Sequence, residues 1–212
     1  MYNCASHFKK VGIVPVIKIS DPNQAIPLAK ALLNGGIAAA EVTFRTAAAP
    51  DVIRAMHSEV PELYVCAGTV LSIEDAKKAK DAGAQAIISP GCDLEVLDWC
   101  ENQDIPYIPG ISSASELMAC LKKGVNFLKL FPAETVGGIS MIKALSGPFP
   151  TVEFMPTGGI NLENVKNYLA VPNVVACGGS WLVPEDDLAA GNFEHIEKLA
   201  REAHLIVQNA GR

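Results

Sequence analysis

Apolar and polar residues follow one another along the chain in a regular succession of short and long segments. Eight short segments are rich in branched aliphatic residues or end in Gly and Pro, which is typical of buried strands bounded by turns. They cover residues 12–19, 38–45, 64–70, 86–91, 106–111, 126–133, 152–159 and 173–179. Longer segments of helical character follow them, and the starts of successive strands lie 20–26 residues apart. That distance is enough for one strand, one helix and two short loops.

The boundaries of the helical segments are also marked in the sequence. Ser72 with Asp75, and Ser113 with Glu116, match the spacing of a capping box at a helix N-terminus. Gly124 stands where its helix is expected to end, as glycine often does after the last helical residue. The pattern therefore predicts eight strand–helix units.

Repeated strand–helix units indicate a parallel sheet, because each crossover helix returns the chain in the same direction. Two architectures remain open, a closed (β/α)8 barrel and an open doubly wound sheet. An open nucleotide-binding sheet usually carries G-x-G-x-x-G after its first strand, and this chain has KISDPNQ there. No linker or change of composition divides the chain. We expect one (β/α)8 TIM barrel domain spanning residues 1–212, with a short N-terminal helix.

Composition narrows the possible functions. Half of the 212 residues are apolar, 19% are charged, and the formal net charge is −6, which disfavours disorder and binding to nucleic acid. No apolar run is long enough to cross a membrane. We therefore expect a soluble, cytoplasmic protein that binds neither nucleic acid nor membrane. The six cysteines form no C-x-x-C pair and are expected to be small buried hydrophobes in a reducing compartment.

The histidines and cysteines also show no spacing typical of metal ligands, so we expect no metal site. The four histidines all fall in segments expected to be helical, away from strand ends, and we expect them at the surface. They are His7, His57, His195 and His204. Because histidine is scarce, other groups are expected to carry any chemistry.

The second strand carries polar residues on one face. Glu41, Thr43 and Arg45 alternate with Val42 and Phe44, so the polar face is expected to point into the barrel. Barrel interiors are normally filled by branched aliphatic residues, and Arg45 lies at the C-terminal strand end, where barrel active sites occur. One alternative is a buried Glu–Arg pair with a purely structural role.

Lys129 occupies an inward position in the sixth strand, between Phe127 and Phe131. Lysine seldom takes a buried position without a cause. Removal from water disfavours the ammonium form, and a free amine is what a Schiff-base nucleophile requires. The alternatives are an amine that reaches solvent and one that is paired with Glu41 or another carboxylate.

Two glycine-rich turns follow the seventh and eighth strands, PTGG from Pro156 and CGGS from Cys177. Glycine lets backbone N–H groups approach an anion, and a following helix N-terminus favours negative charge. The loops at these two positions of a barrel are a frequent phosphate site. The turns therefore predict a phosphate pocket, with Trp181 packed behind it.

Several segments taken together resemble one enzyme family. The sequence is similar to the 2-keto-3-deoxy-6-phosphogluconate (KDPG) and 4-hydroxy-2-oxoglutarate (KHG) aldolases over nearly the whole chain. The similar segments are EVTFRT from Glu41, AGTVL from Ala67, ISPG from Ile88, IPGI from Ile108, KLFPAE from Lys129, KALSGPF from Lys143, PTGGI from Pro156 and GGSWLVP from Gly178.

This resemblance implies a class I aldolase on a (β/α)8 barrel, a homotrimer with no metal or organic cofactor. It implies that Lys129 forms the Schiff base and Glu41 is the general acid/base. The implied substrate is a small phosphorylated 2-keto acid. The remaining implied contacts are Arg45 and Thr69 with the substrate carboxylate, Pro90 and Phe131 with the pyruvate moiety, Thr157 with the substrate hydroxyl, and Gly158, Gly159, Gly178, Gly179 and Ser180 with the phosphate.

Two other functions are compatible with parts of the sequence. A phosphosugar isomerase or epimerase would use the same phosphate site but would ordinarily need a second acid/base group or a metal, which the few histidines disfavour. A phosphate-metabolite binding protein without catalysis would keep the glycine turns but has no need of a lysine at position 129.

Overall fold

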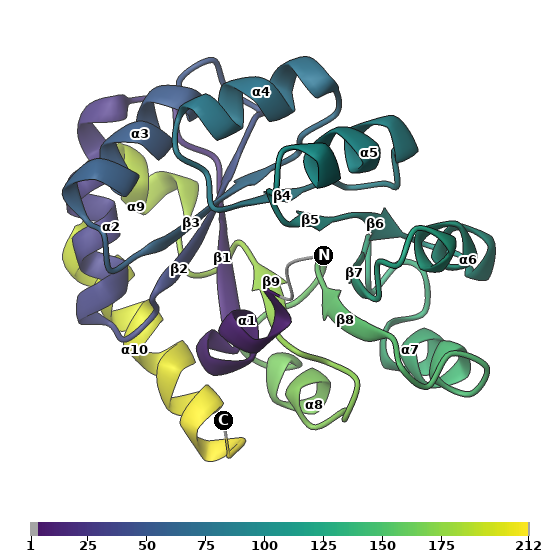
Figure 1. The fold of residues 1–212 in the computed structure, drawn as a ribbon. Coiled ribbons are helices and arrows are strands. Elements are labelled where there is room, and N and C mark those ends of the chain that lie inside the picture. Colours follow the sequence, from purple (N-terminus) through teal and green to yellow (C-terminus); the bar gives the residue numbers. More distant parts are fainter. Residues whose placement is uncertain (1–3, 212) are drawn as a thin grey trace.

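The computed structural model describes residues 4–211 as an α/β fold built on a curled parallel sheet with helices on its outside (Figure 1). The strands are β1 (Ile13–Ile17), β2 (Ala39–Thr43), β3 (Tyr64–Gly68), β4 (Ala86–Ile88), β5 (Tyr107–Ile108), β6 (Gly110–Ile111), β7 (Phe127–Leu130), β8 (Glu153–Pro156) and β9 (Cys177–Gly179). Each of the eight expected strand segments contains at least one of them.

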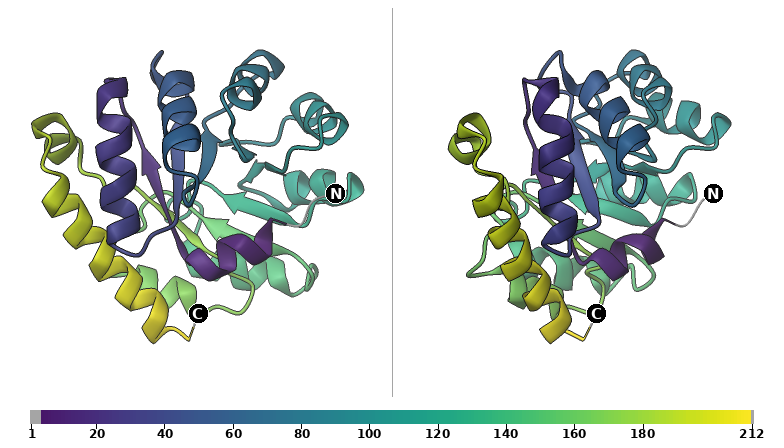
Figure 2. Two further views of the ribbon diagram at one scale, coloured as in Figure 1. Left: turned by 60° about the vertical axis from the view of Figure 1, so that its left-hand side comes forward. Right: turned by 90° about the vertical axis from the view of Figure 1, so that its left-hand side faces the viewer.

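The helices alternate with the strands as expected. They are α1 (Ala5–Val11), α2 (Ala25–Asn34), α3 (Ala49–Glu59), α4 (Ile73–Asp81), α5 (Leu94–Asn102), α6 (Ala114–Lys122), α7 (Gly138–Ser146), α8 (Val165–Leu169), α9 (Glu185–Ala190) and α10 (Phe193–Asn209). The expected caps of α4 and α6 are present, since Ser72 accepts a hydrogen bond from the Asp75 N–H and Ser113 from the Glu116 N–H. Side views show α10 beside α2 on the outer surface (Figure 2).

The sheet forms in two parts whose strand pairs are all parallel. Six strands follow the order β5-β4-β3-β2-β1-β9, and three follow the order β6-β7-β8. Isolated parallel bridges join Phe154 to Val174 and Thr157 to Gly178, at the junction of β8 and β9. At the other junction, β5 and β6 are separated by Pro109, whose carbonyl accepts a hydrogen bond from the Lys129 N–H.

The single strand expected over 106–111 is thus two short strands. Proline has no N–H to donate, so it interrupts the ladder within this segment. The sheet changes partners at this point, from β4 on one side of Pro109 to β7 on the other.

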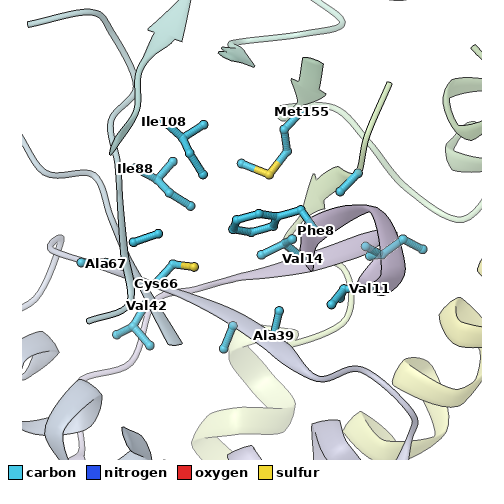
Figure 3. Packing of buried hydrophobic residues seen from close by; sticks show 14 of the residues in the cluster. Phe8, Val11, Val14, Ala39, Val42, Cys66, Ala67, Ile88, Ile108 and Met155 are labelled. Atoms are coloured by element: carbon cyan, nitrogen blue, oxygen red, sulfur yellow. The ribbon is translucent and has the colours of Figure 1, made fainter. Parts of the chain in front are cut away.

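The N-terminal helix α1 lies against one end of the sheet interior. Phe8 is fully buried and lies among Val14, Ile88, Ile108 and Met155 (Figure 3). Its ring centroid is 5.6 Å from that of Phe127, the residue two positions before Lys129. Apolar packing therefore fills this end, and polar side chains are found further along the strands.

Candidate active site

Lys129 and Glu41 meet inside the curled sheet, one from β7 and the other from β2. The Lys129 Nζ lies 2.8 Å from the Glu41 Oε1, and the two side chains are 5% and 0% exposed. Both residues therefore point inward as expected. Of the two alternatives considered for Lys129, the pairing with Glu41 is confirmed. The alternative in which its amine reaches solvent is wrong. The pair shares a hydrogen bond along which a proton can move.

The surroundings of this pair are largely apolar. The Lys129 Nζ lies 5.6 Å from the centre of the Phe131 ring. The Glu41 Oε2 is buried and has no hydrogen-bond partner among the described residues. Burial, reinforced by the Glu41 carboxylate, holds the pKa of the neighbouring Cys66 thiol well above its usual value, so Cys66 is neutral there. The free lone pairs of Oε2 are thus available to accept a proton or hydrogen bond from a ligand.

Space for the Glu41 carboxylate comes from Gly68 on the adjacent strand β3. A Cβ at position 68 would lie 2.5 Å from the Glu41 Cγ and 2.8 Å from its Cδ, both too close for real atoms. Any residue with a Cβ at position 68 would therefore displace Glu41. Gly68 was not among the site residues expected from the sequence; the signal for it is a glycine inside a strand beside an inward carboxylate.

Arg45 lies just beyond β2 and differs from the expectation of an inward position. Its side chain is exposed, and its Nε donates to the Thr43 Oγ1 at 3.1 Å. Thr43 is buried and donates its hydroxyl hydrogen to the Ile17 carbonyl at 2.8 Å. The alternative of a buried Glu–Arg pair is wrong, because Glu41 is paired with Lys129. Thr43 orients Arg45, while the terminal guanidinium NH2 groups donate no hydrogen bond to the part of the chain that the structure describes and are available to bind an anion such as a carboxylate.

Three further expected site residues lie at the same ends of their strands. Thr69 follows β3 directly and has a φ of 56°, which is rare for a β-branched residue. Strained backbone of this kind is concentrated at functional sites. Pro90 follows β4 closely and is half-buried. Thr157 follows β8 and is 5% exposed. Gly178 leaves room for the Thr157 side chain, since a Cβ at position 178 would lie 3.0 Å from the Thr157 Cγ2.

The two glycine turns lie side by side through the bridge between Thr157 and Gly178. Gly158 and Gly159 have φ values of 97° and 82°, a conformation that favours glycine. Within residues 4–211, the N–H groups of Gly159 and Ser180 donate no hydrogen bond, so both are available to an anion.

The sequence predicts a helix N-terminus directly after each glycine turn, and the structure differs on this point. No helix begins directly after either turn, since α8 begins at Val165 and α9 at Glu185. The first turn of α9 is also acidic, with Glu185 followed by two aspartates. Attraction of an anion here would therefore depend on free N–H groups and the Ser180 hydroxyl rather than on a helix dipole. Trp181 packs on Gly179 as expected, and a Cβ at position 179 would lie 2.8 Å from the Trp181 Cη2 and overlap two other atoms of the ring.

The histidine expectation holds for three residues and is wrong for one. His57, His195 and His204 lie on α3 and α10 at or near the surface. His7 instead stacks on Tyr64 with ring centroids 4.1 Å apart, and its buried Nε2 has no hydrogen-bond partner within residues 4–211. Among residues 4–211 there is no cluster of three or more His, Cys, Asp or Glu side chains that could hold a metal ion. Nor does any helix in this range have the length and apolarity to cross a membrane.

Comparison with known proteins decides the family. Residues 4–199 match the family described as "KDPG and KHG aldolase". The chain belongs to this family. It is therefore an aldolase, a carbon–carbon lyase, and neither an isomerase nor a binding protein without catalysis. The resemblance found in the sequence segments is confirmed.

Relatives of this aldolase agree in length and fold. The KHG/KDPG aldolase of Escherichia coli K12 is 49% identical over 191 residues, which is 90% of each chain. The structure of KDPG aldolase from Legionella pneumophila, with pyruvate captured at low pH as a covalent carbinolamine intermediate, is 42% identical with a TM-score of 0.91 and covers 94% of this chain and 97% of its own. KDPG aldolase from Zymomonas mobilis ZM4, solved with 3-phosphoglycerate, is 35% identical with a TM-score of 0.87 over 94% of each chain.

Proposed function

We propose that this chain is a class I aldolase that cleaves KDPG to pyruvate and glyceraldehyde 3-phosphate. We further propose that it cleaves KHG to pyruvate and glyoxylate. The observation that carries the proposal is the buried contact of 2.8 Å between the Lys129 Nζ and the Glu41 Oε1. A lysine nucleophile needs a nearby base to free its amine, and Glu41 is within reach of its proton.

The proposed reaction begins when Glu41 takes a proton from Lys129 and the free amine attacks the substrate C2 ketone. Glu41 returns this proton to the hydroxyl of the resulting carbinolamine, which leaves as water and gives a protonated imine that withdraws electrons from C3. Glu41, acting through one water molecule, removes the proton of the C4 hydroxyl, and the C3–C4 bond breaks. Glyceraldehyde 3-phosphate leaves; Glu41 then protonates the enamine at C3, and hydrolysis of the imine releases pyruvate. One carboxylate thus acts first as base and then as acid.

The Legionella relative supports the first steps of this scheme. In that protein pyruvate is held as a covalent carbinolamine, the species that forms when an amine adds to a ketone. The same addition by Lys129 in this chain would require no metal and no organic cofactor. We propose that none is used.

The substrate groups have proposed partners at the C-terminal ends of the strands. Arg45 and Thr69 would bind the carboxylate, Arg45 through its planar pair of N–H donors. Pro90 and Phe131 would enclose the pyruvate moiety, and Thr157 would hydrogen-bond the substrate hydroxyl. The residues proposed for the phosphate are Gly158, Gly159, Gly178, Gly179 and Ser180.

Three properties of the whole protein are part of the proposal. The bridges between β8 and β9 and the hydrogen bond across Pro109 support a sheet that closes as a (β/α)8 barrel. One such barrel would form a single domain over residues 1–212. We also propose, from the family alone, a cytoplasmic homotrimer.

The test of the function is a continuous assay of pyruvate release from each substrate, coupled to lactate dehydrogenase. We expect turnover of KDPG and, separately, of KHG, and we expect it to persist in the presence of a chelator. Pyruvate release from neither substrate by the folded protein would contradict the proposal. Loss of turnover with the chelator would contradict the metal-free mechanism while leaving the reaction itself in place.

A further inference from the structure

Two of the six cysteines are in contact although 28 positions separate them in the sequence. The Cys120 Sγ donates a hydrogen bond to the Cys92 Sγ, and the two sulfur atoms are 3.2 Å apart. Cys92 lies in the loop between β4 and α5, and Cys120 lies near the C-terminal end of α6. Neither residue has a part in the proposed aldolase mechanism, so the contact calls for a separate explanation.

The two thiols differ in access to solvent. Cys92 is half-buried, whereas Cys120 is fully buried. Burial and the hydrogen bond to Cys92 raise the pKa of the Cys120 thiol, which keeps its proton in the resting protein. A dissolved oxidant therefore reaches Cys92 first, and Cys120 stands directly behind it. This arrangement of an accessible thiol beside a second, protected thiol is typical of pairs that form disulfides on oxidation.

The backbone on both sides of the contact is already fixed. The Gly110 N–H donates to the Gly91 carbonyl at 3.1 Å, immediately before Cys92. On α6, Ser113 caps the helix and Leu117 and Cys120 are buried against the core. Shortening the sulfur separation from 3.2 Å to the length of a disulfide, about 2.0 Å, then requires rotation of the two side chains and little movement of the backbone.

We propose that Cys92 and Cys120 are a redox modification site that forms a reversible internal disulfide. The oxidant is a peroxide or a small-molecule disulfide. With hydrogen peroxide, the Cys92 thiolate attacks one oxygen, the O–O bond breaks, and Cys92 becomes a sulfenic acid while hydroxide leaves. The Cys120 sulfur then attacks the Cys92 sulfur, the S–O bond breaks, and water leaves. Two thiols and one peroxide thus give one disulfide and two water molecules, and a dithiol reductant reverses the change.

The tether has a physical consequence for the protein. It closes a loop that contains all of α5 and the strands β5 and β6, and it restricts the unfolded chain. For a protein of this size we expect the melting temperature to rise on the order of 5–10 °C on oxidation. The bond would also protect Cys92 from further oxidation to sulfinic acid.

The experiment uses the reduced full-length protein, treated with hydrogen peroxide and then alkylated. We expect loss of two of the six thiols and a peptide pair joined through Cys92 and Cys120 by mass spectrometry. Dithiothreitol should restore both thiols and the original melting temperature. Cys92→Ser and Cys120→Ser should each abolish the joined peptide and the rise in melting temperature. Cys4→Ser is the matched control, since Cys4 is also half-buried, and it should behave as the unchanged protein.

Oxidation of Cys92 to sulfinic acid with Cys120 left reduced would overturn the proposal. Disulfides formed only between separate chains would overturn it as well. Because the readouts are thiol counts, joined peptides and melting temperatures, these results do not depend on whether the chain cleaves KDPG.

Discussion

Replacing Gly68 by alanine tests whether the position of the Glu41 carboxylate controls turnover. The added Cβ would lie 2.5 Å from the Glu41 Cγ, where ordinary contacts begin at 3.4 Å. The Glu41 side chain must therefore move by about 1 Å, and it is fully buried with little room to do so. Such a movement separates its Oε1 from the Lys129 Nζ and from the proposed path of the substrate proton.

The size of the effect follows from the proposed role of Glu41. A misplacement of about 1 Å in a catalytic site can cost roughly 100-fold in rate, and loss of a general base costs about 10²–10⁴-fold. We expect the kcat of Gly68→Ala to fall about 100-fold. The strain of the added methyl group should lower the free energy of unfolding by about 1–3 kcal/mol.

The assay is steady-state pyruvate release from KDPG, with Gly147→Ala as the matched control. A Cβ at position 147 would lie 3.6 Å from the Ala144 carbonyl oxygen, an ordinary contact, so this control should keep its kcat. Since Gly68 is expected to act through Glu41, the double variant Gly68→Ala/Glu41→Gln should be no slower than Glu41→Gln alone. A folded Gly68→Ala protein with unchanged kcat would refute this reasoning, as would additive losses in the double variant.

Glu41, Arg45 and His7 can each be tested by a single substitution. Glu41→Gln should lower kcat by about 10²–10⁴-fold, because the amide cannot accept the proton. Exchange of the pyruvate methyl protons, measured by NMR, should slow with it. Exchange at the normal rate would contradict the role of Glu41. Arg45→Ala should raise KM for KDPG by about 10–100-fold, because a hydrogen bond to a charged group contributes about 1.5–3 kcal/mol. An unchanged KM would exclude Arg45 from binding the substrate carboxylate. Burial lowers the pKa of His7 below the 6.5 of an exposed imidazole, so the unfolded chain binds this proton more readily than the folded one. The stability contributed by neutral His7 is thus complete above pH 6.5 and is lost as the pH falls below it. In thermal melts, the melting temperature of His7→Phe should therefore fall less below pH 6.5 than that of the unchanged protein. An identical fall in the two proteins would contradict this assignment.

Much of the fold could be predicted because a parallel α/β structure repeats one unit. Branched residues and glycine turns recur at a near-constant spacing, which predicted every strand segment. The capping-box spacing of Ser72 with Asp75 and of Ser113 with Glu116 predicted the two helix caps. The division of one expected strand at Pro109 was not predicted. It depends on which neighbouring strand pairs on each side of the proline, and that is a property of the folded sheet rather than of the local sequence.

The site was partly predictable for a different reason. In an apolar interior, Glu41 and Lys129 are conspicuous charged residues at inward positions, whereas Arg45, expected inward from the same alternation, is exposed. The sequence left open whether Lys129 meets Glu41 or solvent, because 88 positions separate the two residues. The space left by Gly68 and the contact of Cys92 with Cys120 also arise from long-range packing. Local pattern carries no information on such contacts.

The most direct test of Lys129 as the Schiff-base residue is reductive trapping of pyruvate on the enzyme. The protein is incubated with pyruvate and borohydride, digested, and its peptides are mapped by mass spectrometry. We expect one adduct with the mass of a reduced pyruvate on Lys129, together with loss of turnover in proportion to its formation. No adduct, or an adduct on a different lysine while turnover is lost, would contradict Lys129 as the Schiff-base residue.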